Sequence, residues 1–117
     1  MPVDYRSYTA DECDFVPVAA VGDVPPGERL FFTVRDLDVV LFNIGGQFFA
    51  IEDRCTHDDG PLGDGVLEGT TIVCPRHGAR FDVRTGRVLS PPAPAPVPAF
   101  PVRVRDGQIE VGIPRSR

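Results

Sequence analysis

Short runs of apolar residues, separated by polar residues and glycines, follow one another along most of the chain. Residues 102–105 alternate strictly between valine and arginine, which is the period of a half-buried β-strand. The other runs are rich in β-branched and aromatic residues. The predicted strands span residues 15–19, 30–34, 39–44, 48–51, 102–105 and 109–111. Since no window shows a helical period beyond one turn near residues 20–24, the pattern predicts an all-β fold.

Two dipeptides indicate hairpins between these strands. Gly45-Gly46 lies between the third and fourth predicted strands, and Asp106-Gly107 lies between the last two. Both dipeptides tolerate the positive φ angles that tight hairpin turns require. Pro17 lacks a backbone N–H, so the first strand is expected at the edge of a sheet.

The middle of the chain differs from both ends because it is rich in glycine. Residues 54–82 carry these glycines together with two further predicted strands, at 71–74 and 80–83. Glycine allows loops to fold closely over a site. A length of 117 residues fits one domain. We therefore predict a single domain over residues 13–117 after a polar N-terminal tail at 1–12. In this domain a small subdomain, about 54–82, is inserted in an antiparallel β base.

Residues 90–98 alternate proline with small residues and valine. A proline-rich segment of this kind is stiff and extended. We expect a connector that returns the chain to the base and packs beside the glycine-rich loops. A peptide-recognition motif is the less favoured alternative, because such motifs lie in freely exposed segments.

Charge and composition exclude several classes of protein. The formal net charge of −5 argues against nucleic acid as a partner. No apolar stretch approaches the ~18 residues of a membrane span, and residues 1–6 do not resemble a signal sequence. The low cysteine content indicates a reducing compartment. We expect a cytoplasmic monomer that binds neither nucleic acid nor membrane.

Carboxylates are concentrated in residues 52–68, which we name the acidic segment, and only Arg54 opposes them. They could steer a basic partner toward this part of the surface. They could equally form an ordinary solvated loop surface, and both interpretations stay open. The carboxylates are Glu52, Asp53, Asp58, Asp59, Asp64 and Glu68.

Two short strings carry the candidate chemistry, because each presents one thiol and one imidazole. They use both histidines of the chain and leave Cys13 as a plain packing or surface thiol. A 2Fe–2S cluster with mixed ligands needs two sulfurs on one iron and two nitrogens on the other. The strings are Cys55-Thr56-His57 and Cys74-Pro75-Arg76-His77-Gly78.

A structural zinc site is the rival interpretation, since two cysteines and two histidines can bind one tetrahedral zinc. Zinc modules usually pair cysteine with cysteine and histidine with histidine along the sequence. Here each string is mixed, and the spacing of Cys55 and His57 is cramped for two ligands of one metal. The spacing therefore favours the iron–sulfur cluster.

The pattern C-x-H followed by C-x-x-H-G resembles that of the Rieske family, and residues 14–113 look like one Rieske domain. The resemblance implies the Rieske fold, an antiparallel β base with an inserted cluster-binding subdomain. It also implies one 2Fe–2S cluster per chain. In that arrangement Cys55 and Cys74 bind one iron, and His57 and His77 bind the other.

Details of the resemblance indicate the kind of Rieske protein. High-potential members carry a disulfide between the two loops, at positions that are Gly60 and Arg76 here. They also present hydroxyl donors to the cluster at positions that are Ala79 and Phe81 here. Fewer donors to the sulfurs lower the potential, so we expect a value near the low end of the range, about −150 mV. This is typical of Rieske ferredoxins, which carry single electrons from a flavin reductase to a terminal ring-hydroxylating oxygenase.

The chain is expected to be an electron-transfer protein and not itself an enzyme. An oxygenase needs a second iron held by two histidines and a carboxylate, and His57 and His77 are already assigned. One alternative is a Rieske accessory of another redox system, such as the small subunit of an assimilatory nitrite reductase or a donor linked to iron–sulfur assembly. A structural zinc-binding interaction module is the remote alternative.

Overall fold

The computed structural model describes residues 8–56, 58–93 and 95–115. Within these ranges it contains strands and two short 3-10 turns but no α-helix, which confirms the predicted all-β fold. The 3-10 turns are η1 (Ala10–Glu12) and η2 (Val21–Asp23). The strands are β1 (Cys13–Ala20), β2 (Arg29–Val34), β3 (Leu37–Ile44), β4 (Gln47–Glu52), β5 (Val66–Glu68), β6 (Thr71–Val73), β7 (Arg80–Asp82), β8 (Val88–Ser90), β9 (Ala99–Phe100), β10 (Val102–Arg105) and β11 (Gln108–Pro114).

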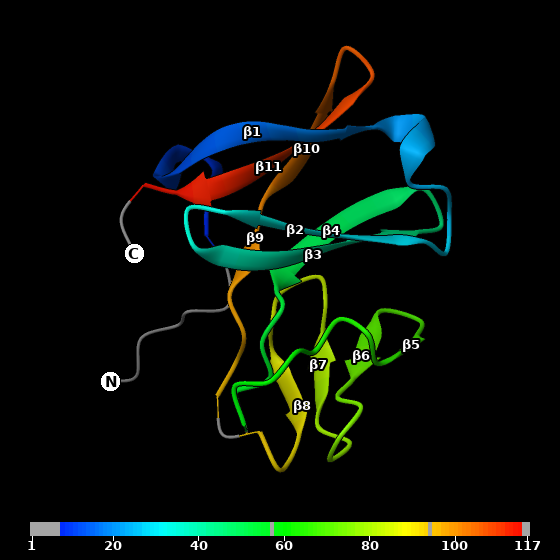
Figure 1. Cartoon of the computed structure of the whole chain (residues 1–117), viewed down its shortest axis with the longest axis vertical. Coiled ribbons are helices and arrows are strands. Elements are labelled where there is room, and N and C mark those ends of the chain that lie inside the picture. The colour runs from blue at the N-terminus through cyan, green and yellow to red at the C-terminus, as the bar shows by residue number, and fades with distance from the viewer. Residues whose placement is uncertain (1–7, 57, 94, 116–117) are drawn as a thin grey trace.

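The strands form three antiparallel sheets in two parts of the molecule (Figure 1). The base contains a sheet of order β1-β11-β10 and a sheet of order β2-β3-β4-β9. The third sheet, of order β5-β6-β7-β8, lies below the base in Figure 1. It belongs to residues 53–98, between β4 and β9, which we name the inserted subdomain.

Strand β3 carries the packing that joins the two parts, because it is buried on both faces. Val39 and Leu41 belong to the core between the two base sheets. Val40 and Phe42 point the other way and belong to the core of the inserted subdomain. This is the two-residue period of a strand, with apolar side chains on both faces. The sheet containing β3 is therefore the middle layer of the molecule.

The two predicted hairpins are confirmed. Gly45 and Gly46 turn the chain from β3 to β4 with φ angles of 62° and 93°. Asp106 and Gly107 turn it from β10 to β11 with φ angles of 53° and 76°. β1 lies at a sheet edge, as Pro17 predicts, and its register shifts between Pro17 and Ala19.

The sheet of the inserted subdomain extends beyond the predicted limit at residue 82. Strand β8 follows that limit and pairs with β7, with Phe81 opposite Val88. Strands β5, β8 and β9 were absent from the sequence prediction. Each has three residues or fewer, so no alternation can be read from it, and its partner strand determines its conformation.

The proline-rich segment packs against the inserted subdomain, as expected for a connector. Ala93 and Val97 are buried in the same core as Cys55 and Cys74. The Thr56 hydroxyl donates a hydrogen bond to the Ala95 carbonyl at 2.6 Å. The segment then continues into β9, which returns the chain to the base (Figure 1).

Part of the predicted N-terminal tail lies outside the described residues, which begin at Tyr8. The Tyr8 ring stacks on Phe100 with 5.8 Å between ring centroids, and its N–H donates to the Ala99 carbonyl at 3.0 Å. Residues 8–12 therefore include direct contacts with the base. Within the described ranges, no helix has the length and apolar character required to cross a membrane.

Candidate metal centre

The first candidate loop closes through two backbone hydrogen bonds around Cys55. The Cys55 N–H donates to the Gly60 carbonyl at 2.8 Å, and the Asp59 N–H donates to the Cys55 carbonyl at 2.8 Å. Asp59 has a φ of 61°, in the left-handed region that lets the chain reverse in a tight loop.

The second loop repeats this arrangement around Cys74. The Cys74 N–H donates to the Ala79 carbonyl at 2.7 Å, and the Gly78 N–H donates to the Cys74 carbonyl at 3.1 Å. Gly78 has a φ of 77° at the position that Asp59 occupies in the first loop. The two cysteines are thus held by loops of closely similar backbone structure.

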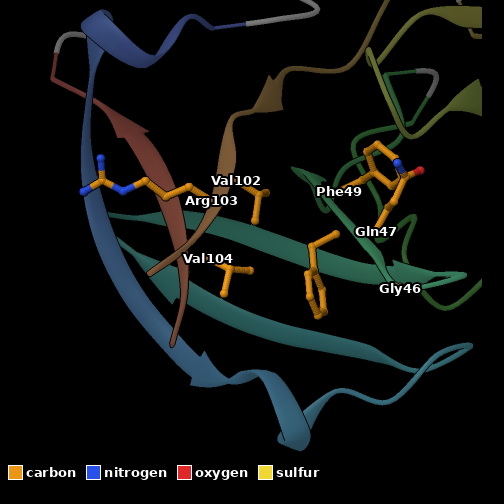
Figure 2. A pocket seen from close by; sticks show the side chains of 7 residues that line it. Gly46, Gln47, Phe49, Val102, Arg103 and Val104 are labelled. Atoms are coloured by element: carbon orange, nitrogen blue, oxygen red, sulfur yellow. The ribbon is translucent and has the colours of Figure 1, made fainter. Parts of the chain in front are cut away.

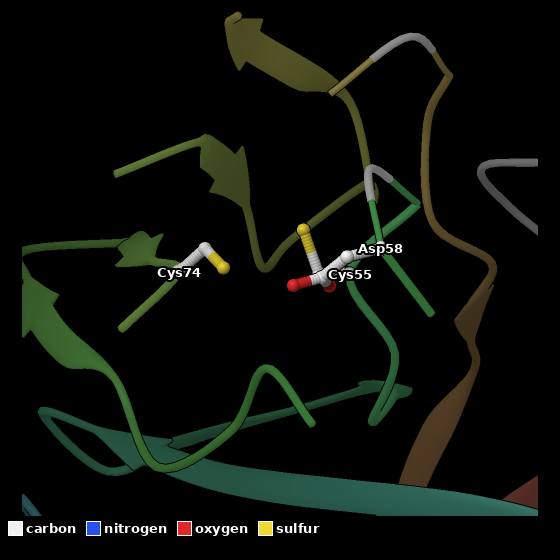
Figure 3. Close-up of side chains that lie close together, drawn as sticks. All are labelled: Cys55, Asp58 and Cys74. Atoms are coloured by element: carbon white, nitrogen blue, oxygen red, sulfur yellow. The ribbon is translucent and has the colours of Figure 1, made fainter. Parts of the chain in front are cut away.

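The two cysteine side chains converge between these loops. The Sγ atoms of Cys55 and Cys74 and a carboxylate oxygen of Asp58 all lie within 4.8 Å of one another, and Figure 3 shows the Cys74 sulfur directed toward the other two. Cys55 is 0% exposed and Cys74 is 2% exposed, yet the two thiols form no disulfide. Two buried thiols from separate loops fit the pair of sulfur ligands that one iron of a 2Fe–2S cluster requires.

The backbone of the second loop favours the thiolate form of Cys74. Burial raises the pKa of this thiol. Hydrogen bonds from the N–H groups of Arg76 and His77, a hydrogen bond with the Cys55 side chain and the positive charge of Arg76 outweigh burial and lower the pKa overall. A thiolate is the form that binds a metal.

The structure brings together only part of the predicted ligand set. The His77 side chain is 50% exposed, and its Nδ1 lies 3.6 Å from Asp58 Oδ2. It therefore lies beside the thiol pair, toward the surface. His57 lies outside the described residues, so its predicted role rests on the sequence pattern alone.

An arginine and an aspartate join the two loops through a contact that no local sequence pattern indicates. Arg76 Nε donates to Asp58 Oδ2 at 2.5 Å, and Nη2 donates to Oδ1 at 2.9 Å. The hydrogen bond to Asp58 raises the pKa of Arg76 above its usual value. Nη1 also donates to the Pro61 carbonyl at 2.7 Å, and Nη2 lies 3.5 Å from Cys74 Sγ.

Further contacts fix the segment that follows the first loop. Asp53 Oδ1 accepts hydrogen bonds from the N–H groups of Leu62 and Gly63, at 2.8 and 2.6 Å. Arg29, on β2 of the base, donates to the carbonyls of Gly63 and Gly65. A charged residue from each part of the molecule thus holds this segment in place.

Most carboxylates of the acidic segment have local partners. Besides Asp53 and Asp58, three of them form ion pairs with two neighbouring arginines, and these pairs offset part of their charge. The ion pairs are Glu52–Arg54 at 3.3 Å, Asp59–Arg54 at 2.9 Å and Glu68–Arg80 at 2.5 Å. Arg54, Arg76 and Arg80 together balance three of the six carboxylate charges, so the acidic segment keeps a local excess of negative charge.

Two other features, the third cysteine and a surface pocket, lie away from the paired cysteine loops. Cys13 is a buried thiol at the start of β1, in agreement with the predicted packing role. A pocket between β4 and β10 is lined by Phe49, Val102 and Arg103 among others (Figure 2). The Arg103 guanidinium pairs with Glu110 at 2.6 Å and lies over the Phe15 ring.

Comparison with known proteins identifies the family. Residues 14–101 match the Rieske [2Fe-2S] domain model. The chain is 41% identical over 98 residues to the 3-phenylpropionate/cinnamic acid dioxygenase ferredoxin subunit of Escherichia coli (strain K12), covering 83% of this chain and 92% of that protein.

Solved structures agree with this match. The ferredoxin of carbazole 1,9a-dioxygenase from Nocardioides aromaticivorans IC177 has a TM-score of 0.78 at 35% identity, over 83% of this chain and 95% of that one. A chain in a complex of reduced oxygenase and oxidized ferredoxin in carbazole 1,9a-dioxygenase has a TM-score of 0.78 at 36% identity, over 84% and 92%. The family match leaves the zinc interpretation without support. The chain belongs to the Rieske [2Fe-2S] domain family, and its cofactor is the Rieske cluster.

Proposed function

We propose that this chain is the ferredoxin component of a Rieske dioxygenase system. It carries single electrons from a flavin-dependent reductase to a terminal ring-hydroxylating oxygenase. Its similarity to dioxygenase ferredoxin subunits, over most of both chains, supports this role. The solved complex of an oxygenase with a similar ferredoxin supports the terminal oxygenase as one partner.

The observation that carries the proposal is the pair of buried thiols between two similar loops, next to a half-exposed imidazole. Cys55 and Cys74 would hold one iron as thiolates, and His57 and His77 would hold the other. When bound, the cluster accepts and releases one electron at a time. The two cysteines are buried, whereas the His77 side chain is half exposed and offers a short path to a partner at the surface.

Spectroscopy of the purified protein tests the ligand set. We expect a red-brown protein whose dithionite-reduced form gives the EPR spectrum of a mixed-ligand 2Fe–2S cluster. Cys55→Ser, Cys74→Ser, His57→Ala and His77→Ala should each abolish or change this spectrum, whereas Cys13→Ser should leave it unchanged. A wild-type spectrum that survives both histidine substitutions would contradict the assignment.

Reconstitution tests the electron-transfer role. The purified protein is combined with the flavin-dependent reductase and the terminal oxygenase of a Rieske dioxygenase system, and oxidation of NAD(P)H coupled to product formation is measured. Turnover that depends on this chain supports the proposal. The same assay is repeated with an assimilatory nitrite reductase in place of the dioxygenase. If the chain supports only nitrite reduction, the dioxygenase role is wrong.

A further inference from the structure

We propose that the Arg76–Asp58 ion pair is a clamp between the two ligand loops, in which Arg76 is a positioning residue. The clamp holds the Cys74 loop against the Cys55 loop at the spacing that the cluster requires. This inference rests on the proposed ligand set and adds a residue that is not itself a ligand.

The contacts show why Arg76 can act in this way. Its guanidinium uses three nitrogens on the opposite loop, two on the Asp58 carboxylate and one on the Pro61 carbonyl. A planar guanidinium that bonds a carboxylate through two nitrogens fixes orientation as well as distance. The side chains of Arg76 and Asp58 are 32% and 24% exposed, so solvent only partly screens the pair.

The residue at position 60 fits the same arrangement. A Cβ atom at Gly60 would lie 2.7 Å from Arg76 Cζ and 2.8 Å from Nη2. The Gly60 N–H also donates to Asp58 Oδ1 at 3.0 Å. Glycine at this position therefore leaves room for the guanidinium to reach Asp58, and alanine would force it to move.

The two charges of the clamp have opposite expected effects on the reduction potential. Arg76 Nη2 lies 3.5 Å from Cys74 Sγ, so its charge favours an added electron nearby. The Asp58 carboxylate lies within 4.8 Å of both sulfurs and disfavours it. Loss of either residue opens the clamp, however, so both losses should weaken retention of the cluster.

The experiment uses holoprotein variants and two readouts. The reduction potential is measured by voltammetry, and the rate of cluster loss is measured from visible absorbance on warming with a chelator. Arg76→Gln and Asp58→Asn change one charge each. Arg76→Lys and Gly60→Ala keep both charges and disturb only the geometry. Arg80→Gln is the matched control, because Arg80 pairs with Glu68 within one sheet and does not join the loops.

We expect all four clamp variants to lose the cluster several-fold faster than the wild type and Arg80→Gln to lose it at the wild-type rate. The potential should fall in Arg76→Gln, rise in Asp58→Asn and stay close to the wild-type value in Arg76→Lys and Gly60→Ala. Should Arg76→Gln fail to fold, Arg76→Lys and Gly60→Ala provide the same test.

Two results would overturn the clamp. Wild-type rates of cluster loss in Arg76→Lys and Gly60→Ala would show that Arg76 acts only through its charge. Equal acceleration in Arg80→Gln would show a general loss of subdomain stability. A wild-type protein that carries no iron–sulfur cluster would overturn the proposed function itself, and that outcome is visible before any variant is made.

Discussion

At position 65 the chain passes so close to strand β6 that no side chain fits. A Cβ atom at Gly65 would lie 1.8 Å from the Val73 carbonyl oxygen, which belongs to the backbone and has little freedom to move. This close approach fixes the start of β5 against β6, directly before Cys74. Position 65 therefore requires glycine because of this contact and not because of a positive φ angle.

Gly65→Ala should therefore destabilise the protein by more than about 3 kcal/mol, because the β5–β6 contact would have to separate. Urea unfolding of the variant and the wild type measures the change. Gly22→Ala is the control, since a Cβ atom at Gly22 meets nothing within 4 Å, and a change within about 0.5 kcal/mol is expected. Similar unfolding midpoints for the two variants would contradict this account.

The sequence indicates the candidate ligands but not the contacts that support them. Cys55 and Cys74 were predicted because short, local spacing carries their signal, and the structure brings their sulfurs together. The contact of Arg76 with Asp58 joins two loops that are distant in the sequence, so no local pattern indicates it. The sequence showed only their charges, and Asp58 was grouped with the other acidic residues.

Among the structural elements, the turn between β7 and β8 depends on one carboxylate. Asp82 accepts hydrogen bonds from the backbone N–H and the guanidinium of Arg84, and its backbone carbonyl accepts from the N–H of Gly86 at 2.7 Å. The Arg84 side chain lowers the pKa of Asp82 and outweighs burial, which raises it. The turn therefore stabilises the folded state most when Asp82 is ionised.

The sign of the pH effect follows from this lowered pKa. The contribution of Asp82 is present above the ordinary carboxyl pKa of 3.8 and is lost as the pH falls toward the lower folded-state value. Asp82→Asn should thus flatten the decline in stability below about pH 4.5, as measured by urea midpoints at successive pH values. Arg84→Gln should flatten it as well, because Arg84 is the main cause of the lowered pKa. If the urea midpoints of both variants decline below pH 4.5 as steeply as those of the wild type, Asp82 does not contribute to the pH dependence of stability.

The sequence predicts those strands and turns whose own residues favour that structure. The β3–β4 hairpin has two strands rich in β-branched and aromatic residues and Gly45-Gly46 between them, so strand type and turn could both be predicted. Strand β9 has two residues after a proline-rich segment and exists through its pairing with β4. Such a strand depends on its partner and not on its own composition.

In the molecule as a whole, two separate apolar cores lie on opposite faces of the middle sheet. One core contains Cys55 and Cys74 together with Phe81 and Val97 of the inserted subdomain. The other lies between the base sheets and contains no predicted ligand. The stability of the base should therefore depend little on the cofactor.

Removal of iron under reducing conditions should loosen the inserted subdomain and leave the base folded. Hydrogen exchange measures this directly: amides of β6 and β7 should exchange much faster in the apoprotein, and amides of β3 and β11 should keep their protection. Buffer-treated holoprotein is the control. Equal loss of protection in both parts would show that the two cores unfold as one unit.

The inserted subdomain leaves and rejoins the base at one point. Ile51 of β4 lies opposite Ala99 of β9, and the Glu52 N–H donates to the Pro98 carbonyl at 3.0 Å. The two ends of the insertion are therefore neighbouring antiparallel strands, about 4.8 Å apart. A tight turn can bridge that distance, so the base has the geometry of an uninterrupted hairpin. The redox part of this protein is consequently a cassette whose ends match those of a hairpin loop. A transplanted cassette would also have to cover Val40 and Phe42 of β3, which pack into the core of the insertion here.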